Sequence, residues 1–179
     1  TETDDEIDDG HISPIVVNNP VAPNVVQQRL VSNVVESRTL YPESYVYSVA
    51  ISNDGDIIVS GAVDYIQIWN RHTGILIQTL EGHEENVLSV AISPDGNTIV
   101  SGSQDDTIKM WEKRNNEFEI IRTLTNHTGP VNSVVVSTDG DIIVSGSSDN
   151  TIKIWDRHTG ELKHTLYDEY EADAVVISN

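Results

Sequence analysis

The sequence predicts an all-β protein built from a repeated unit of about 42 residues. Two β-branched runs around a turn rich in Gly, Ser and Asn occupy Asp141–Asp156, and the same stretch recurs at Asn97–Glu112 and, one residue shorter, at Asp56–Asn70. Ile, Val and Thr suit the pleated surface of a strand, while Gly and Asn tolerate positive φ, so each copy is a predicted β-hairpin. The three tryptophans, one in each copy, lie 42 and 44 residues apart. The chain is therefore a repeat array.

Each repeat contains four short candidate strands. A β-branched run that ends in a tight turn precedes each hairpin, at residues 49–55, 90–96 and 134–140. A Thr-Leu pair marks a further strand, at residues 39–40, 79–80, 123–124 and 165–166. Turn residues stand at the junctions, and the repeats show no helical period. A period of about 40–45 residues with four strands and a closing Trp-Asp is the signature of a β-propeller blade.

With these residues the chain resembles the WD-repeat (Trp-Asp) β-propeller family over residues 39–179. Motif positions of that family are matched in register by Gly82-His83, Ser93 to Gly96, Ser101 to Ser103, Asp105 and Trp111, and by His127, Ser145, Asp149, Trp155 and Asp156. The resemblance implies a β-propeller of four-stranded antiparallel blades in residues 37–179. It also implies a non-catalytic scaffold that binds other proteins.

Two sets of side chains contain the Ser, His and Asp of a hydrolase triad. The resemblance instead implies a structural network within each blade, formed by His83, Ser101, Asp105 and Trp111 and again by His127, Ser145, Asp149 and Trp155. A buried imidazole, carboxylate, hydroxyl and indole N–H can satisfy one another, whereas a triad needs an exposed serine beside oxyanion donors. A duplicated set favours architecture over catalysis. We therefore expect no catalytic residue and no enzyme activity.

The first and last repeats depart from this pattern, because the loops before residue 46 and at 165–171 lack the histidine. Such blades are less tightly specified, as is typical of terminal units. Two further histidines, His72 and His158, occupy equivalent R-H-T-G sequences, which predict hairpin turns. Metal ligands must converge within a few ångström, and the histidines are separated between repeats. The sequence therefore predicts no metal site and no cofactor.

The composition argues against several classes of partner. Asp and Glu outnumber Lys and Arg 29 to 10, which gives a formal net charge of −19. Binding of nucleic acid requires clustered basic residues, so neither nucleic acid nor an anionic membrane surface is an expected partner. No run approaches the roughly 20 apolar residues of a transmembrane helix. The chain has no cysteine and no visible signal peptide, which leaves both a cytoplasmic and an extracellular location open.

The first 36 residues lie outside the repeats. Residues 1–10 carry six acids and no base, which predicts a solvated acidic tail; a calcium loop is the alternative, but Ile7 falls at a ligand position. Residues 11–36 are rich in Val, Asn and Pro, which favours extended chain, with a short helix over residues 25–36 as the alternative.

The repeats do not complete a ring of the usual 4–8 blades, since the chain holds about three and a half of them. The pattern predicts the last strand of one blade around residues 38–41, three whole blades, and one first strand at residues 174–178. An open end leaves strand edges and apolar faces bare. Three completions are open: the chain is a fragment of a longer array, the N-terminal segment supplies the missing strands, or other copies of the chain complete the ring. We favour other copies, as a closed homo-oligomer or a filament.

Partner contacts are expected in the loops at the end of the blades that carries the histidines. The candidate partner-binding residues mix aromatic side chains and acids, and are Tyr45, Glu84, Glu85, Gln104, Thr128, Pro130, Tyr170 and Glu171. Such a surface favours a basic protein partner. The alternative function is a structural self-assembling subunit whose main partner is itself.

Overall fold

The computed structural model describes residues 40, 42, 44–167 and 169–177, and this part is all-β. It contains three sheets of four consecutive strands each, which we call blades 1, 2 and 3. Blade 1 consists of β1 (Ser48–Ile51), β2 (Ile57–Gly61), β3 (Tyr65–Asn70) and β4 (Leu76–Glu81). Blade 2 consists of β5 (Val87–Ile92), β6 (Thr98–Ser103), β7 (Ile108–Arg114) and β8 (Glu117–Leu124). Blade 3 consists of β9 (Val131–Val136), β10 (Ile142–Ser147), β11 (Thr151–Asp156) and β12 (Leu162–Tyr167).

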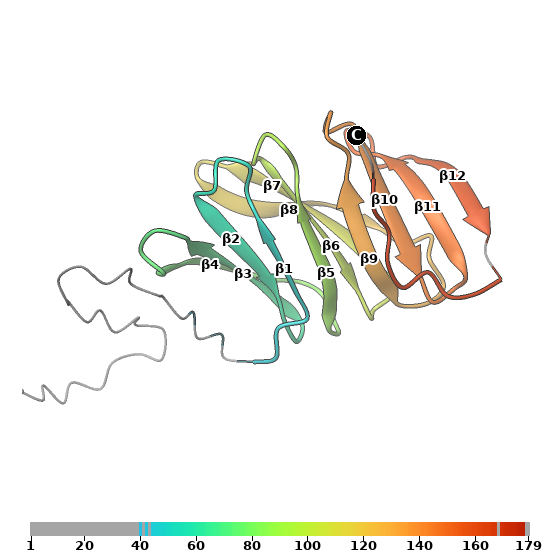
Figure 1. Cartoon of the computed structure of the whole chain (residues 1–179), viewed down its shortest axis with the longest axis horizontal. Helices are drawn as coiled ribbons and strands as arrows, with labels where there is room; N and C mark the ends of the chain where they lie inside the picture. Colours follow the sequence, from blue (N-terminus) through green and yellow to red (C-terminus); the bar gives the residue numbers. More distant parts are fainter. Residues whose placement is uncertain (1–39, 41, 43, 168, 178–179) are drawn as a thin grey trace, which may run out of the picture.

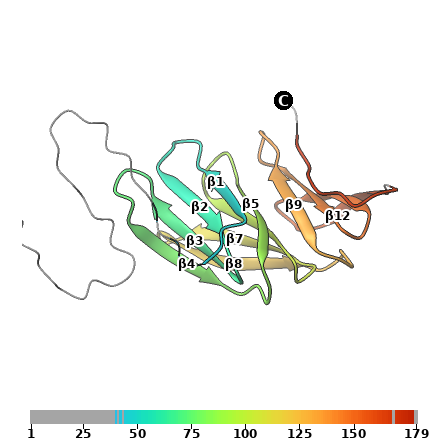
Figure 2. The same cartoon turned by 60° about the horizontal axis from the view of Figure 1, so that its bottom comes forward.

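Every blade is a simple antiparallel meander, so neighbours in sequence are neighbours in the sheet. The three blades stand side by side in sequence order (Figure 1). The turns between second and third strands place Asp64, Asp106 and Asn150 at positive φ, between 61° and 65°, as the hairpin pattern predicts. The β-propeller arrangement of four-stranded blades expected from the sequence is confirmed, and within the described residues the ring is not closed (Figure 2).

The hydrophobic core lies between the blades, because each sheet is apolar on both faces. One cluster joins side chains from β2, β3 and β4 of blade 1 to the side of blade 2 that faces blade 1. It contains Val59, Ile66, Ile68, Leu80, Val87, Val90, Ile99, Trp111 and Phe118. A second cluster repeats this between blades 2 and 3, with Val100, Ile108, Met110, Leu124, Val131, Val134, Ile143 and Trp155. The cohesion of the molecule therefore comes mainly from contacts between neighbouring blades.

The strand expected at residues 174–178 is not formed in its described part, residues 174–177. A strand needs a neighbouring strand to pair with, and the described residues contain no second strand for a fourth blade. The segment 172–177 nevertheless runs alongside blade 3 (Figure 1). The Ala172 N–H donates to the Ser147 carbonyl (3.1 Å), and the Val175 N–H donates to Ser133 Oγ (3.1 Å).

Several expectations lie outside the described residues. They concern the acidic tail, the segment 11–36, and all but Leu40 of the strand around residues 38–41. The part of the chain that the structure describes contains no helix long and apolar enough to cross a membrane.

Candidate functional site

A chain of hydrogen bonds links four side chains of blade 2. His83, in the loop before β5, lies with Nδ1 2.7 Å from Asp105 Oδ2 and with Nε2 2.8 Å from Ser101 Oγ. The Trp111 indole N–H donates to the same serine oxygen at 2.9 Å. The turn between β6 and β7 positions Asp105, whose other oxygen accepts a hydrogen bond from the Thr107 hydroxyl at 2.6 Å. The structure thus brings together all four residues that the sequence singled out in this repeat.

Blade 3 repeats the arrangement almost atom for atom. His127 Nδ1 lies 2.8 Å from Asp149 Oδ2, and His127 Nε2 lies 2.8 Å from Ser145 Oγ. The Trp155 indole N–H donates to Ser145 Oγ at 2.9 Å, and the Thr151 hydroxyl donates to Asp149 at 2.5 Å. The second set of four predicted residues is therefore also assembled.

The protonation states in these networks follow from burial. Burial lowers the pKa of both His83 and His127 below the usual value, although the neighbouring aspartates oppose this effect. Burial also acts to raise the pKa of Asp149, but hydrogen bonds from Thr151, His127 and the Thr128 N–H outweigh it and lower that pKa to about 2. At neutral pH each network therefore contains a neutral imidazole and an ionised carboxylate.

With this protonation the serine hydroxyl donates to the imidazole and the imidazole N–H donates to the carboxylate, as in a hydrolase triad. However, Ser101 and Ser145 are both fully buried, and the tryptophan N–H occupies a lone pair of each hydroxyl. A nucleophile must reach its substrate beside oxyanion donors, and neither serine can do so in this structure. The hydrogen bonds of each network hold the loop before the first strand of the blade to the second and third strands.

Blade 1 has only a remnant of this network. The Trp69 indole N–H donates to Ser60 Oγ at 3.0 Å, but the loop before β1 contains no histidine. The Gln67 side chain is buried, and its carbonyl oxygen has no hydrogen-bond partner among the described residues. Blade 1 is therefore held with fewer polar contacts than blades 2 and 3.

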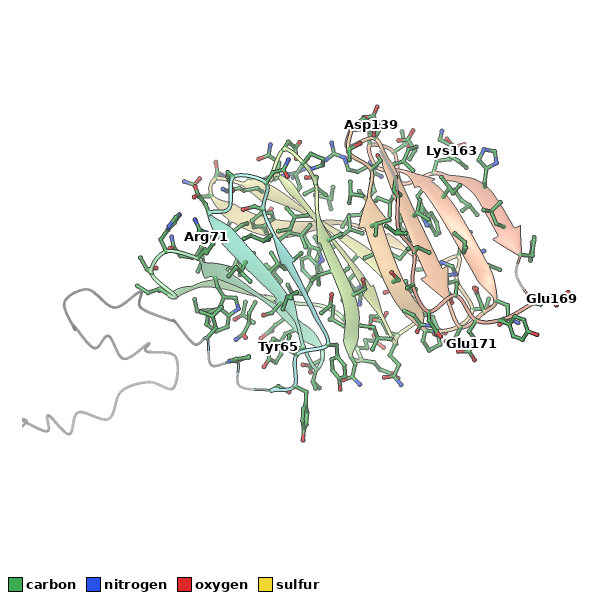
Figure 3. The ribbon with its side chains drawn as sticks, in the orientation of Figure 1. Tyr65, Arg71, Asp139, Lys163, Glu169 and Glu171 are labelled. Carbon is green, nitrogen blue, oxygen red and sulfur yellow. The ribbon has the colours of Figure 1, made fainter. Side chains whose placement is uncertain are left out.

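The predicted partner-binding residues lie at one end of the blades, just outside the networks, and we call this set the loop surface. Seven of the eight are exposed and Pro130 is half-buried. Figure 3 shows Glu171 at this end, with Arg71, Asp139 and Lys163 at the opposite end. Hydrogen bonds brace the loops: the Asn86 amide donates to Gln104, and the Ser148 hydroxyl donates to Glu171, each at 3.0 Å. The loop surface is thus braced at blades 2 and 3.

The R-H-T-G turns lie at the opposite end and form surface contacts. His72 Nε2 lies 3.0 Å from Asp56 Oδ1, and His158 Nε2 lies 3.0 Å from Asp141 Oδ1. All four side chains are more than half exposed. Across the described residues, no group of three or more His, Asp or Glu side chains is arranged to hold a metal ion.

The comparison with protein families identifies the repeats. The family model for the WD domain, G-beta repeat, matches residues 35–70, 74–112 and 118–156, which together exceed half of the chain. The chain belongs to the WD40 repeat family. Each match ends one residue after a tryptophan, so a WD40 repeat comprises the fourth strand of one blade and the first three strands of the next.

Solved WD40 structures share the fold. The chain is 24% identical to a structure of U3-55K, with a TM-score of 0.68 over 74% of this chain and 42% of that one. It is 25% identical to the RRP9 WD40 repeats, with a TM-score of 0.68 over 74% of this chain and 41% of the other. The chain thus spans about two fifths of each of these proteins. No curated protein sequence gives a significant match.

Polar contacts that were not predicted from the sequence join one blade to the next. The Val90 N–H donates to Ser48 Oγ at 3.1 Å, and the Val134 N–H donates to Ser89 Oγ at 3.0 Å. The Arg157 guanidinium, from blade 3, donates to Thr98 Oγ1 of blade 2 at 2.7 Å. The signal available was the recurrence of serine at the same position in successive first strands.

Proposed function

We propose that this WD40 chain is a non-catalytic scaffold that binds other proteins through the loop surface. WD40 propellers are in general protein-interaction modules without catalytic activity. The observation that most supports the proposal is the contrast between the two polar networks and the loops outside them. Both Ser-His-Asp sets are buried and satisfied internally, whereas the loops that they brace are exposed. The polar network repeated in blades 2 and 3 therefore serves the shape of the blade, and the exposed side chains outside it are available to a partner.

The charge of the loop surface favours a basic partner. Glu84, Glu85 and Glu171 are exposed acids, and Tyr45 and Tyr170 are aromatic side chains that are 81% and 76% exposed. Aromatic anchors with surrounding acids suit a protein surface rich in Lys and Arg, because complementary charge accelerates association and aromatic burial strengthens it.

The test compares two variants of equal charge in binding to a partner. A partner isolated by affinity capture is purified, and its affinity for the chain is measured by calorimetry. The double variant E84K/E85K should weaken binding about tenfold or more, because it places cations opposite a basic surface. The matched control E117K/E119K changes two exposed glutamates of β8, away from the loops. Equal affinities for the two variants would reject the loop surface as the binding site.

A second candidate function, a self-assembling subunit, is supported by a different observation. The apolar side chains Val49 and Ile51 of β1 are 67% and 58% exposed, and Leu166 of β12 is 52% exposed. These side chains lie at the two ends of the row of blades, whereas Val90 and Leu124, which correspond to Val49 and Leu166 in blade 2, are each 6% exposed. Association of copies would cover them.

A further inference from the structure

The R-H-T-G turn of blade 3, residues 157–160, contacts blade 2 as well as its own blade. Arg157 Nη1 donates to Thr98 Oγ1, at the start of β6, at 2.7 Å. The Nε of the same guanidinium donates to the Gly140 carbonyl, in the turn between β9 and β10. The sequence pattern predicts only a hairpin turn at these residues. In the structure, one side chain connects two turns of blade 3 to the second strand of blade 2.

The hydrogen bond to Thr98 outweighs the ion pair that accompanies it. The Arg157 side chain is 13% exposed and Thr98 is 3% exposed, so solvent does not compete for this contact. Asp95 Oδ2 lies 3.8 Å from Arg157 Nη2, and the Asp95 side chain is 49% exposed, so solvent screens that attraction. Removal of the guanidinium would leave a buried hydroxyl without its donor, which is the more costly change.

Blade 2 also holds the same turn from its outer strand. Arg122 Nη2, on β8, donates to the His158 carbonyl at 3.1 Å. Gly160 lies against the stem of this arginine, and a Cβ added there would be 2.8 Å from Arg122 Cδ. Gly160 also has a φ of 74°, which favours glycine. Three of the four residues of the turn therefore take part in the contact with blade 2.

The hydroxyl and the arginine occur at the same junction. Thr98 occupies the position of Ile57 in blade 1, and Arg157 occupies the position of Lys113 in blade 2. The junction between blades 1 and 2 therefore has neither group. There, the Gln78 amide of β4 hydrogen-bonds instead to the backbone of β8, donating at 2.9 Å and accepting at 2.8 Å. Each junction thus has a polar contact of its own.

We propose that the R-H-T-G turn of blade 3, with Thr98 and Arg122, is a lock that sets the angle between blades 2 and 3. The apolar cluster between these blades holds them together, but apolar contact is not directional. Hydrogen bonds from a planar guanidinium are directional and favour one relative orientation.

The lock lies at the end of the blades that carries Asp139, opposite the loop surface (Figure 3). A strand of six residues such as β6 is about 20 Å long, so a change of angle at one end displaces the loops at the other. The lock therefore positions the loops of blades 2 and 3 relative to each other. This inference goes beyond the scaffold function, and its test needs no partner.

The distance between the loops tests the positioning directly. The chain has no cysteine, so two introduced cysteines can carry spin labels without further changes. Glu84→Cys with Thr128→Cys labels equivalent loops of blades 2 and 3, and Tyr45→Cys with Glu84→Cys labels blades 1 and 2. Arg157→Met should broaden the distance distribution of the first pair about twofold and leave that of the second pair unchanged.

The R-H-T-G turn of blade 1 provides the matched control. Arg71 donates to the Gly55 carbonyl, as Arg157 does to that of Gly140, and within the described chain its other hydrogen-bonding contact is His72 of the same turn. Arg71→Met therefore removes the contact within a blade but none between blades 2 and 3. It should leave the distance between the loops of blades 2 and 3 unchanged.

Amide hydrogen exchange measured by NMR tests the lock itself. The Val134 N–H donates across the junction of blades 2 and 3, and the Val90 N–H donates across the junction of blades 1 and 2. Arg157→Met should accelerate exchange at Val134 about tenfold more than at Val90, because only the first junction loses a hydrogen bond. Thr98→Val removes the acceptor from the other side and should reproduce this difference. Arg122→Met, at an exposed side chain, should shift it in the same direction.

Arg157→Lys separates charge from geometry. Lysine keeps the charge, but its single nitrogen cannot replace Nε and Nη1 together, so this variant should behave as Arg157→Met does. Exchange in Arg157→Lys equal to that of the unaltered chain would overturn the proposal. Equal acceleration at Val134 and Val90 would overturn it too, since it would indicate a general loss of stability.

A first-pair distance distribution as narrow in Arg157→Met as in the unaltered chain would overturn the positioning role. Glu84→Lys with Glu85→Lys, which tests the scaffold function, should leave amide exchange at Val134 unchanged. Failure of this inference is therefore distinguishable from failure of the scaffold function.

Discussion

At the scale of the residue, the imidazoles of His83 and His127 are the centres of the two networks. Each is buried, with a side-chain exposure of 1% and 0% respectively, and each connects a loop to the interior of its blade. A buried group that loses its partner retains the cost of having left water. The contribution of each histidine is therefore larger than that of the exposed His72 and His158.

His127→Ala should lower the free energy of unfolding by about 1–3 kcal/mol, because Ser145 and Asp149 would each lose a buried partner. Urea unfolding followed by tryptophan fluorescence measures this loss. His158→Ala, at an exposed turn, is the matched control and should change stability by less than about 0.5 kcal/mol. An unchanged midpoint for His127→Ala would show that the network does not stabilise the blade.

Stability should fall in two steps as the pH is lowered. The folded pKa of His83 and His127 is below the unfolded value of 6.5, so their contribution is present above pH 6.5 and declines as the pH falls below it. The pKa of Asp149 is lowered from 3.8 to about 2, so its contribution is lost between these values. Urea midpoints measured at a series of pH values check this. The variant with both histidines replaced by Gln should lack the first step, and a first step of equal size in that variant contradicts the assignment.

The network residues could be identified from the sequence because each occurs twice in register, at the positions of a known motif. The serines Ser48, Ser89 and Ser133 could not, although they recur as well. A serine in a strand can bond to its own backbone, to water or to a neighbour, and only the packing of two blades shows that it accepts the N–H of the next blade. The burial of Gln67 could not be predicted from the sequence either, because it follows from the position of β3 in the fold.

At the scale of the element, the second strand of each blade is shaped by its glycine. The Gly102 backbone does not require positive φ, so the reason for glycine is the space beside it. Gly102→Ala should lower the free energy of unfolding by about 1–3 kcal/mol, because the added methyl would lie 2.6 Å from Val131 Cγ1 and 3.0 Å from the Val131 carbonyl oxygen. Chemical unfolding of the purified variant measures the loss.

A double-mutant cycle separates this crowding from a general effect on the strand. If the clash with Val131 is the cause, Gly102→Ala combined with Val131→Ala should cost less than the sum of the two single losses. Strict additivity would point to the backbone of β6 instead. Gly102→Ala tests how much the free energy of unfolding falls, and the cycle tests whether contact with Val131 causes the fall. One prediction can therefore fail while the other holds.

The twelve strands of the described residues were predictable from alternation and turn residues, and the exception at residues 174–177 has a physical reason. A sequence pattern describes what a segment would do beside a suitable neighbour. Residues 172–177 have the pattern of a first strand and contact Ser133 and Gly146 as a first strand would. They lack the paired second strand that produces a ladder, so they remain extended chain against blade 3.

At the scale of the whole molecule, net charge and local charge act in opposite directions on association. Each copy carries a formal charge of −19, so copies repel one another at low salt. The Debye length shrinks from about 30 Å at 0.01 M to about 10 Å at 0.1 M salt, which screens this repulsion. Salt at these concentrations does not weaken contacts between the apolar side chains of blades 1 and 3. We therefore expect added salt to promote any association of copies.

Light scattering from about 10 to about 500 mM sodium chloride, a range that brackets the screening length, determines the sign. A decrease in association with salt would mean that close ion pairs outweigh the net charge.

A WD40 repeat and a blade begin at different strands, and this offset affects how such a chain can lengthen. One WD40 repeat, such as residues 74–112, contains the outer strand of blade 1 and the three inner strands of blade 2. It therefore includes Val87 and Val90, which pack on the preceding blade, and Gly102 and Ser89, which contact the following blade. A tandem duplication of the gene segment for one repeat would insert a blade together with both halves of its interface. A blade added in this way needs no compensating substitutions, so each duplication preserves the packing between neighbouring blades.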